Sequence, residues 1–138
     1  MSKDEQAWGR FVALHARVES ELTKALQRRH GLGLSEYRAL QCLSELPKNT
    51  ARIQELAEAL GLNQSSVSRL VARLEEAKLS ERDICETDRR GIYTMLTNDG
   101  LERLAAAQPT YETTLAGALD KAEADPTLTQ AVQVLRST

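Results

Sequence analysis

The chain has 138 residues, a length typical of one domain and enough to bury a single hydrophobic core. Hydrophobic residues make up 41% of the chain and charged residues 28%, which excludes a disordered or fibrous protein. The net charge of -2 excludes a general polyanion binder, because such proteins are usually strongly basic. Any contact with nucleic acid therefore has to come from the local placement of charge.

The sequence carries no sign of a membrane span, a signal peptide or a metal site. No stretch approaches the roughly 18 consecutive apolar residues of a membrane helix, and the N-terminal segment lacks the apolar centre of a signal peptide. Cys42 and Cys85 are too few for a disulfide framework, and His15 and His30 are not spaced with them as ligands. We therefore expect a cytoplasmic protein without a metal or other cofactor.

The N-terminal segment, from about Asp4 to Arg29, is predicted to form one long amphipathic helix, because its apolar residues recur every three to four positions. At about 1.5 Å per residue such a helix would be roughly 39 Å long, which exceeds what one small core covers. Part of the apolar stripe is therefore expected to pack on another subunit. The stripe comprises Trp8, Phe11, Val12, His15, Val18, Leu22, Ala25 and Leu26.

A second helix is predicted after the glycines Gly31 and Gly33, which break the first pattern. Ser35 is a suitable N-cap, and Pro47 and Asn49 end the helix. One face of this helix is expected to be lined by Ala39, Cys42, Leu43 and Leu46.

Two further helices follow with a short link between them. The first ends at Gly61, the residue type most able to adopt the left-handed conformation after a helix, and Asn63 is a good N-cap for the second. Two amphipathic helices joined by three residues predict a helix-turn-helix. Their apolar faces comprise Ile53, Leu56, Ala57 and Leu60 in the first and Val67, Leu70, Val71 and Leu74 in the second.

The remainder of the chain predicts a β-hairpin and two C-terminal helices. Segments at about Leu79–Ile84 and Ile92–Leu96 favour strands, with the polar segment Cys85–Gly91 between them. Thr97 caps the next helix, whose apolar stripe continues to Ala122 with a kink or break at Pro109. A last short helix carries Leu128, Ala131, Val132 and Leu135.

The outward face of the second helix of the pair has residue types that suit the major groove of DNA. Arginine can bind guanine through two hydrogen bonds, glutamine can bind adenine, and serine can reach bases or phosphates. A solvated polar face of an ordinary helix is the alternative. The best candidates for reading bases are Gln64, Ser65, Ser68 and Arg69, and the best candidates for phosphate contacts are Ser66 and Arg73.

The hairpin favours the DNA-binding interpretation, because two arginines lie at its turn. A helix-turn-helix followed by such a hairpin is the element order of a winged helix, and an arginine at the tip can enter the narrow minor groove. Asp88 lies two residues before Arg90, close enough to orient its guanidinium group. Arg89 is better placed for a contact to the DNA backbone.

The segment from Leu56 to Gly100 resembles the DNA-binding core of the MarR family of transcriptional regulators. The wing of that family typically reads L-x-E-R, a short gap, D-x-R or D-R-R, a strand, and L-T-x-x-G. Lys78 departs from the family pattern where a glycine commonly ends the helix, and Ser80 departs where an apolar strand residue is common. The matching residues are Leu79, Glu81, Arg82, Asp88, Arg89, Arg90, Leu96, Thr97 and Gly100.

The resemblance implies a mainly α fold, a winged helix-turn-helix with a short β-hairpin wing. Residues 1–138 would form a single MarR-like unit, with the DNA-binding lobe at 35–97 and dimerisation helices at 4–30 and 98–138. The family binds near-palindromic double-stranded DNA operators as homodimers, more often as repressors than as activators. The implied DNA-binding residues are Asn63, Gln64, Ser65, Ser66, Ser68, Arg69, Arg73, Arg82, Asp88, Arg89 and Arg90, with Arg90 in the minor groove and Asp88 as its partner.

The resemblance also implies a small-molecule effector, since members of the family often respond to anionic or phenolic ligands or to oxidation of a cysteine. Trp8, His15 and Arg17 on the first helix and Tyr111 on the C-terminal one are candidates for lining a ligand pocket. Packing in a core or an interface is the alternative for these four residues. Cys42 is expected to be a buried hydrophobic residue.

Two other function classes compete with a DNA-binding regulator. An enzyme is disfavoured, because the sequence has no nucleophile motif, no glycine-rich phosphate loop and no metal-ligand spacing. A winged helix that binds a protein partner instead of specific DNA would explain the acidic balance. Such a module has no reason to place Asp88, Arg89 and Arg90 together at the turn.

Overall fold

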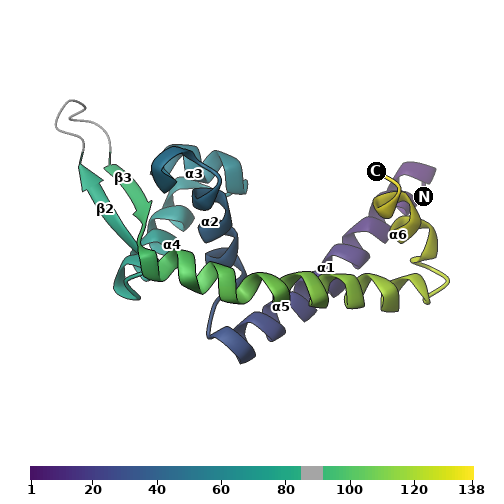
Figure 1. The fold of residues 1–138 in the computed structure, drawn as a ribbon. Coiled ribbons are helices and arrows are strands. Elements are labelled where there is room, and N and C mark those ends of the chain that lie inside the picture. The colour runs from purple at the N-terminus through teal and green to yellow at the C-terminus, as the bar shows by residue number, and fades with distance from the viewer. Residues whose placement is uncertain (85–91) are drawn as a thin grey trace. The chain divides into compact units, whose positions relative to one another are not determined.

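A computed structural model describes residues 1–84 and 92–138 of the chain, which are mostly helical with one small antiparallel sheet (Figure 1). This confirms the predicted mainly α fold class. The helices are α1 (Lys3–His30), α2 (Leu34–Ser44), α3 (Ile53–Leu60), α4 (Gln64–Glu76), α5 (Asn98–Glu123) and α6 (Thr129–Arg136). The strands are β1 (Thr50–Arg52), β2 (Ser80–Ile84) and β3 (Ile92–Leu96), and a 3₁₀ turn, η1 (Pro47–Asn49), precedes β1.

The chain forms two compact units. The first unit joins Met1–Gly31 to Pro109–Thr138, and the second comprises Leu32–Gln108. The boundary in α5 falls at Pro109, and the helix continues through this residue rather than breaking there. Across residues 1–84 and 92–138, none of the helices is both long and apolar enough to span a membrane.

The first unit contains α1, the second half of α5, and α6. α6 packs against α1, and the two chain termini lie close together (Figure 1). The C-terminal half of the predicted α1 stripe is buried, including Leu22 and Leu26. Toward the N-terminus the same stripe faces solvent, since the side chains of Trp8 and Val12 are 71% and 49% exposed.

The second unit packs the helices α2, α3 and α4 against a sheet with strand order β1-β3-β2. β3 is central and antiparallel to both neighbours, and the β2–β3 register runs from Ser80 opposite Leu96 to Ile84 opposite Ile92. The core of this unit is formed by fully buried apolar side chains. They include Leu40, Leu43, Leu56, Val67, Leu70 and Leu74.

The predicted start and apolar face of α2 differ from the structure. Gly33 is the N-cap rather than Ser35, and the carboxylate of Glu36 accepts a hydrogen bond from the Gly33 N–H at 3.4 Å. The buried face includes Tyr37 and Leu40 beside the expected Ala39 and Leu43, whereas Cys42 and Leu46 are only partly buried. The buried face of α2 is therefore rotated relative to the predicted face, and it includes the large side chain of Tyr37, which is 1% exposed.

Candidate nucleic-acid interface

The entry into α4 is built by Gly61 and Asn63. Gly61 ends α3 with a φ of 67°, the left-handed conformation that glycine adopts without strain. Two residues later, Oδ1 of Asn63 accepts a hydrogen bond from the Ser66 N–H at 2.8 Å and caps α4. The three-residue link of the predicted helix-turn-helix is therefore short and fixed at both ends.

The two faces of α4 are separated as predicted. Val67, Leu70, Val71 and Leu74 are at most 2% exposed. On the opposite face the side chains are exposed, and the first turn of the helix contains no acidic residue. Ser66 is partly buried, and its Oγ lies 3.4 Å from Nη2 of Arg69. The exposed face comprises Gln64, Ser65, Ser68, Arg69, Ala72 and Arg73.

Two arginines that were predicted to bind DNA, Arg73 and Arg82, form ion pairs with carboxylates. Nε of Arg73 lies 3.4 Å from Oε1 of Glu36 in α2, and Nε of Arg82 in β2 lies 3.1 Å from Oε1 of Glu75 in α4. Sequence reasoning missed both acids. Glu36 and Glu75 belong to elements other than those of their arginines, so no helical or strand spacing connects them.

An arginine and a tyrosine side chain connect strands β1 and β3 of the sheet next to the predicted wing. Arg52 in β1 lies opposite Tyr93 in β3, its Nε donates a hydrogen bond to the tyrosine hydroxyl at 3.0 Å, and its Cζ lies 5.4 Å from the ring centroid. Neither residue was predicted as part of the site, because β1 itself was not predicted. Asp88, Arg89, Arg90 and Cys85 lie outside the residues that the structure describes.

The junction between the sheet and α5 explains the L-T-x-x-G pattern. Oγ1 of Thr97 donates a hydrogen bond to the Lys78 carbonyl at 2.8 Å and accepts one from the Gly100 N–H at 3.0 Å. A Cβ at Gly100 would clash with the carbonyl oxygen of Leu79. Thr97 is therefore the predicted cap of α5, and a side chain at Gly100 would separate α5 from the start of the wing.

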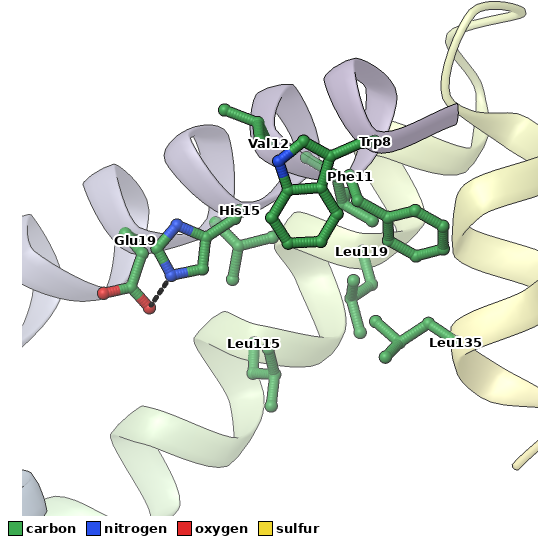
Figure 2. A pocket seen from close by; sticks show the side chains of 10 residues that line it. Trp8, Phe11, Val12, His15, Glu19, Leu115, Leu119 and Leu135 are labelled. Carbon is green, nitrogen blue, oxygen red and sulfur yellow. Dashed lines mark ion pairs between the residues drawn. The ribbon is translucent and has the colours of Figure 1, made fainter. Parts of the chain in front are cut away.

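A second candidate site is an apolar groove of about 490 Å³ in the first unit. Its walls come from α1, α5 and α6, and Trp8, Phe11, Leu119 and Leu135 surround its apolar part (Figure 2). His15 lies at its edge, with Nε2 3.7 Å from Oε1 of Glu19. The lining residues are Trp8, Phe11, Val12, Leu14, His15, Val18, Glu19, Leu115, Leu119 and Leu135.

The groove includes two of the four predicted ligand-binding residues. Trp8 and His15 line it, whereas Arg17 and Tyr111 are not among its lining residues. The Nη1 atom of Arg17 lies 3.5 Å from Oδ2 of Asp125. The pKa of Asp125 is lowered, mainly by hydrogen bonds from the backbone and side chain of Thr127.

Cys42 does not have the surroundings of a reactive thiol. Burial raises the pKa of its thiol, and the nearby carboxylate of Glu45 raises it further. Because the thiolate is the reactive form, both effects make Cys42 less reactive than an exposed cysteine. The residue is partly buried rather than fully buried as expected.

Comparison with known proteins identifies relatives of the whole chain. The sequence model of the MarR family matches residues 32–92. Among solved structures, AbsC, a MarR family transcriptional regulator from Streptomyces coelicolor, is 30% identical, has a TM-score of 0.79, and aligns over 100% of this chain and 98% of its own. Sco3205, a MarR family transcriptional regulator from the same organism solved in complex with DNA, is 28% identical with a TM-score of 0.82 over 99% of this chain and 86% of its own. A MarR/EmrR family transcriptional regulator from Acinetobacter sp. ADP1 is 26% identical, with a TM-score of 0.73 over 99% and 96% of the two chains.

Proposed function

The chain belongs to the MarR family of transcriptional regulators, and we propose that it acts as a dimeric regulator that binds a specific DNA operator. The observation that carries this proposal is the exposed face of α4, which is polar and basic and has no acidic residue in its first turn. Sco3205 was solved in complex with DNA, which supports double-stranded DNA as the partner of this chain as well.

In this proposal α4 is the recognition helix and lies in the major groove. Gln64, Ser65, Ser68 and Arg69 read bases, because they lie on the exposed face near the capped N-terminus of the helix. The phosphate backbone at the edges of the major groove is contacted by Asn63, Ser66, Arg73 and Arg82. Contacts to phosphates fix the register of the protein on DNA, and contacts to bases provide its sequence preference.

The wing is proposed to enter the minor groove. Arg90 would insert there, Asp88 would orient its guanidinium group, and Arg89 would contact the backbone. The antiparallel pairing of β2 with β3 supports this role, because it brings the two strands that flank these residues together.

The groove in the first unit is proposed to be the dimer interface. It is lined mainly by apolar side chains, and Trp8 and Val12 remain largely exposed in the single chain. A two-fold axis through this surface would bury the same residues of both subunits. Two recognition helices placed about 34 Å apart could then enter successive major grooves of a near-palindromic operator.

Repression released by a small-molecule effector completes the proposal. A dimer bound across a promoter would exclude the polymerase, and a ligand that favours another separation of the lobes would release it. Such a ligand acts only through its difference in affinity between the two states. Trp8 and His15 are the two predicted ligand residues that line the groove. Because the same groove is proposed as the dimer interface, the effector response of variants at these positions has to be measured together with their dimer mass.

The central test is a fluorescence anisotropy titration of the purified protein against its own upstream intergenic DNA and against operators from random-site selection. We expect specific binding whose affinity falls steeply with salt. Arg69→Ala should lower the preference at one base position by about 1 to 3 kcal/mol. Arg90→Ala should weaken binding to all sequences and reduce the log-log salt slope by about one.

A matched control for these variants is Lys24→Ala, which removes a positive charge from an exposed position in the other unit. It should leave both sequence preference and salt slope unchanged. Absence of any specific binding in intergenic and selected DNA would refute the proposal. That result would favour the alternative, a winged-helix module that binds a protein partner.

A further inference from the structure

Two arginines at the edges of the proposed DNA interface are each held by a carboxylate from a neighbouring element. Nε of Arg73 in α4 lies 3.4 Å from Glu36 in α2, and Nε of Arg82 in β2 lies 3.1 Å from Glu75 in α4. Both arginine side chains nevertheless remain mostly open to solvent, at 54% and 57% exposure. The acids hold these side chains without burying them.

The atom that makes the contact matters for what the arginine can still bind. Nε is the guanidinium nitrogen nearest the backbone. Nε of Arg82 donates a hydrogen bond to Glu75 and Nε of Arg73 forms an ion pair with Glu36, so both contacts restrict the side chain at its inner nitrogen. The terminal Nη groups keep donors that match the oxygens of a phosphate. Among residues 1–82 and 92–138, no second carboxylate pairs with either Arg73 or Arg82. Each side chain is therefore oriented and still has donors to offer.

We propose that Glu36 and Glu75 are positioning residues for DNA binding, which hold Arg73 and Arg82 ready to contact phosphates. An arginine loses much rotamer freedom when it is fixed in a complex, and a partner that restricts it beforehand reduces this loss. The inference rests on the proposed function and adds two acidic residues to it. Neither acid touches DNA in this proposal.

The direction in which Glu36→Gln changes the affinity for DNA distinguishes a positioning role from a simple effect of charge. Glu36→Gln removes a negative charge next to the interface, so charge alone would make binding to DNA tighter. Loss of positioning makes binding weaker. Glu36 uses Oε2 for the Gly33 N–H, at 3.4 Å, and Oε1 for Arg73. Glutamine has only one acceptor oxygen, so the variant can keep the hydrogen bond from Gly33 only by giving up the contact with Arg73.

The experiment measures operator affinity by fluorescence anisotropy for Glu36→Gln, Glu75→Ala and the control Glu76→Ala. Glu76 is an exposed acid of the same helix, and no ion pair involves it within the described part of the chain. We expect the first two variants to bind about three- to tenfold more weakly than the wild type. The control should bind equally well or more tightly.

A double-mutant cycle identifies the residue through which Glu36 acts. In an Arg73→Ala background, Glu36→Gln should cause no further loss of affinity, because no side chain is left to position. A purely structural role of Glu36 would instead lower the melting temperature and leave the affinity of the folded protein unchanged. The same cycle with Arg82→Ala tests Glu75.

The outcomes distinguish this inference from the proposed function. If the wild-type protein binds no DNA specifically, the proposed function fails. If the wild type binds its operator and both Glu36→Gln and Glu75→Ala bind it equally well or more tightly, the positioning role is wrong and the function stands. Weaker binding that persists unchanged in the arginine-to-alanine backgrounds would also overturn the positioning role.

Discussion

Lys78 adopts a backbone conformation that usually belongs to glycine. Its φ is 64°, and it lies just beyond α4, where the Leu79 N–H donates to the Leu74 carbonyl and the Lys78 N–H to the Glu75 carbonyl. This pair of hydrogen bonds is a Schellman motif, whose left-handed position favours glycine. Lys78 therefore keeps the backbone geometry that the glycine of the family pattern would have, and the lysine is strained in it.

Lys78→Gly is expected to stabilise the protein by about 0.5 to 1 kcal/mol, because relief of left-handed strain exceeds the extra entropy of the unfolded glycine. Urea unfolding at a fixed protein concentration measures the change. Lys24→Gly, in the exposed middle of α1, should lower stability by about 1 kcal/mol. Equal losses in both variants would contradict the strain argument.

Substitution of valine for Thr94 and for Thr97 is expected to change the free energy of unfolding in opposite directions. The Thr94 side chain is fully buried, and among the described residues its hydroxyl has no hydrogen-bond partner. Thr94→Val should raise the free energy of unfolding by about 1 kcal/mol, because a buried hydroxyl without a partner is removed. Thr97→Val should lower it by about 1 to 2 kcal/mol, because the hydroxyl of Thr97 caps α5. Differential scanning calorimetry of both variants tests the pair, and a loss in both would show that Thr94 is satisfied.

Single residues were predictable from sequence where local periodicity determines their environment. The burial of Val67 and Leu70 and the exposure of Ser65 and Arg69 follow from the helical repeat alone. The partnership of Arg73 with Glu36 was not predictable, because it joins two helices whose relative placement no local pattern encodes. Tertiary packing decided the surroundings of the arginines.

The elements show the same division between local and non-local information. Gly61 and Asn63 are caps with a strong local preference, so the end of α3 and the start of α4 were predicted to the residue. β1 was not predicted, because its three residues form a strand only through pairing with β3. The predicted start of α2 was wrong. Serine is a stronger N-cap residue type than glycine, and yet the helix begins after Gly33 rather than after Ser35.

The contact between α5 and the start of β2 is predicted to tolerate no side chain at Gly100. A Cβ there would clash with the Leu79 carbonyl, whereas a Cβ at Gly117 in the same helix would meet no atom within 4 Å. Gly100→Ala should lower the free energy of unfolding by about 1 to 3 kcal/mol through overpacking. Gly117→Ala should raise it by about 0.5 to 1 kcal/mol through better helix propensity.

Chemical denaturation of the two glycine variants tests this difference directly. Both substitutions add one methyl group to the same helix, so propensity alone predicts a gain for each. A gain at Gly100 would mean that α5 can move away from Leu79 at little cost. Opposite signs would place the constraint in the junction between α5 and the sheet.

The whole molecule presents an apolar surface that one chain alone does not cover. Trp8, Val12 and Leu135 are 71%, 49% and 46% exposed, and all three line the groove of the first unit (Figure 2). Trp8 is the only tryptophan in the chain. Its fluorescence therefore reports directly on whether this surface is buried in the proposed dimer.

Leu135→Glu is expected to weaken the proposed dimer, because it would place an unpaired charge in the proposed apolar interface. The dimer dissociation constant should rise at least about tenfold. Sedimentation velocity measures the mass, and the emission of Trp8 should shift to longer wavelength as the ring becomes hydrated. Operator binding should weaken in parallel, since only a dimer engages both halves of a near-palindromic site.

Gln133→Glu provides the matched control, because Gln133 is an exposed residue of α6 that does not line the groove. It adds the same charge to the same helix, so it should leave the mass, the emission and the operator affinity unchanged. If Leu135→Glu remains dimeric with unaltered Trp8 emission, the subunits associate through another surface. If it becomes monomeric and still binds the full operator with wild-type affinity, dimerisation contributes nothing to recognition and the paired-lobe geometry is wrong.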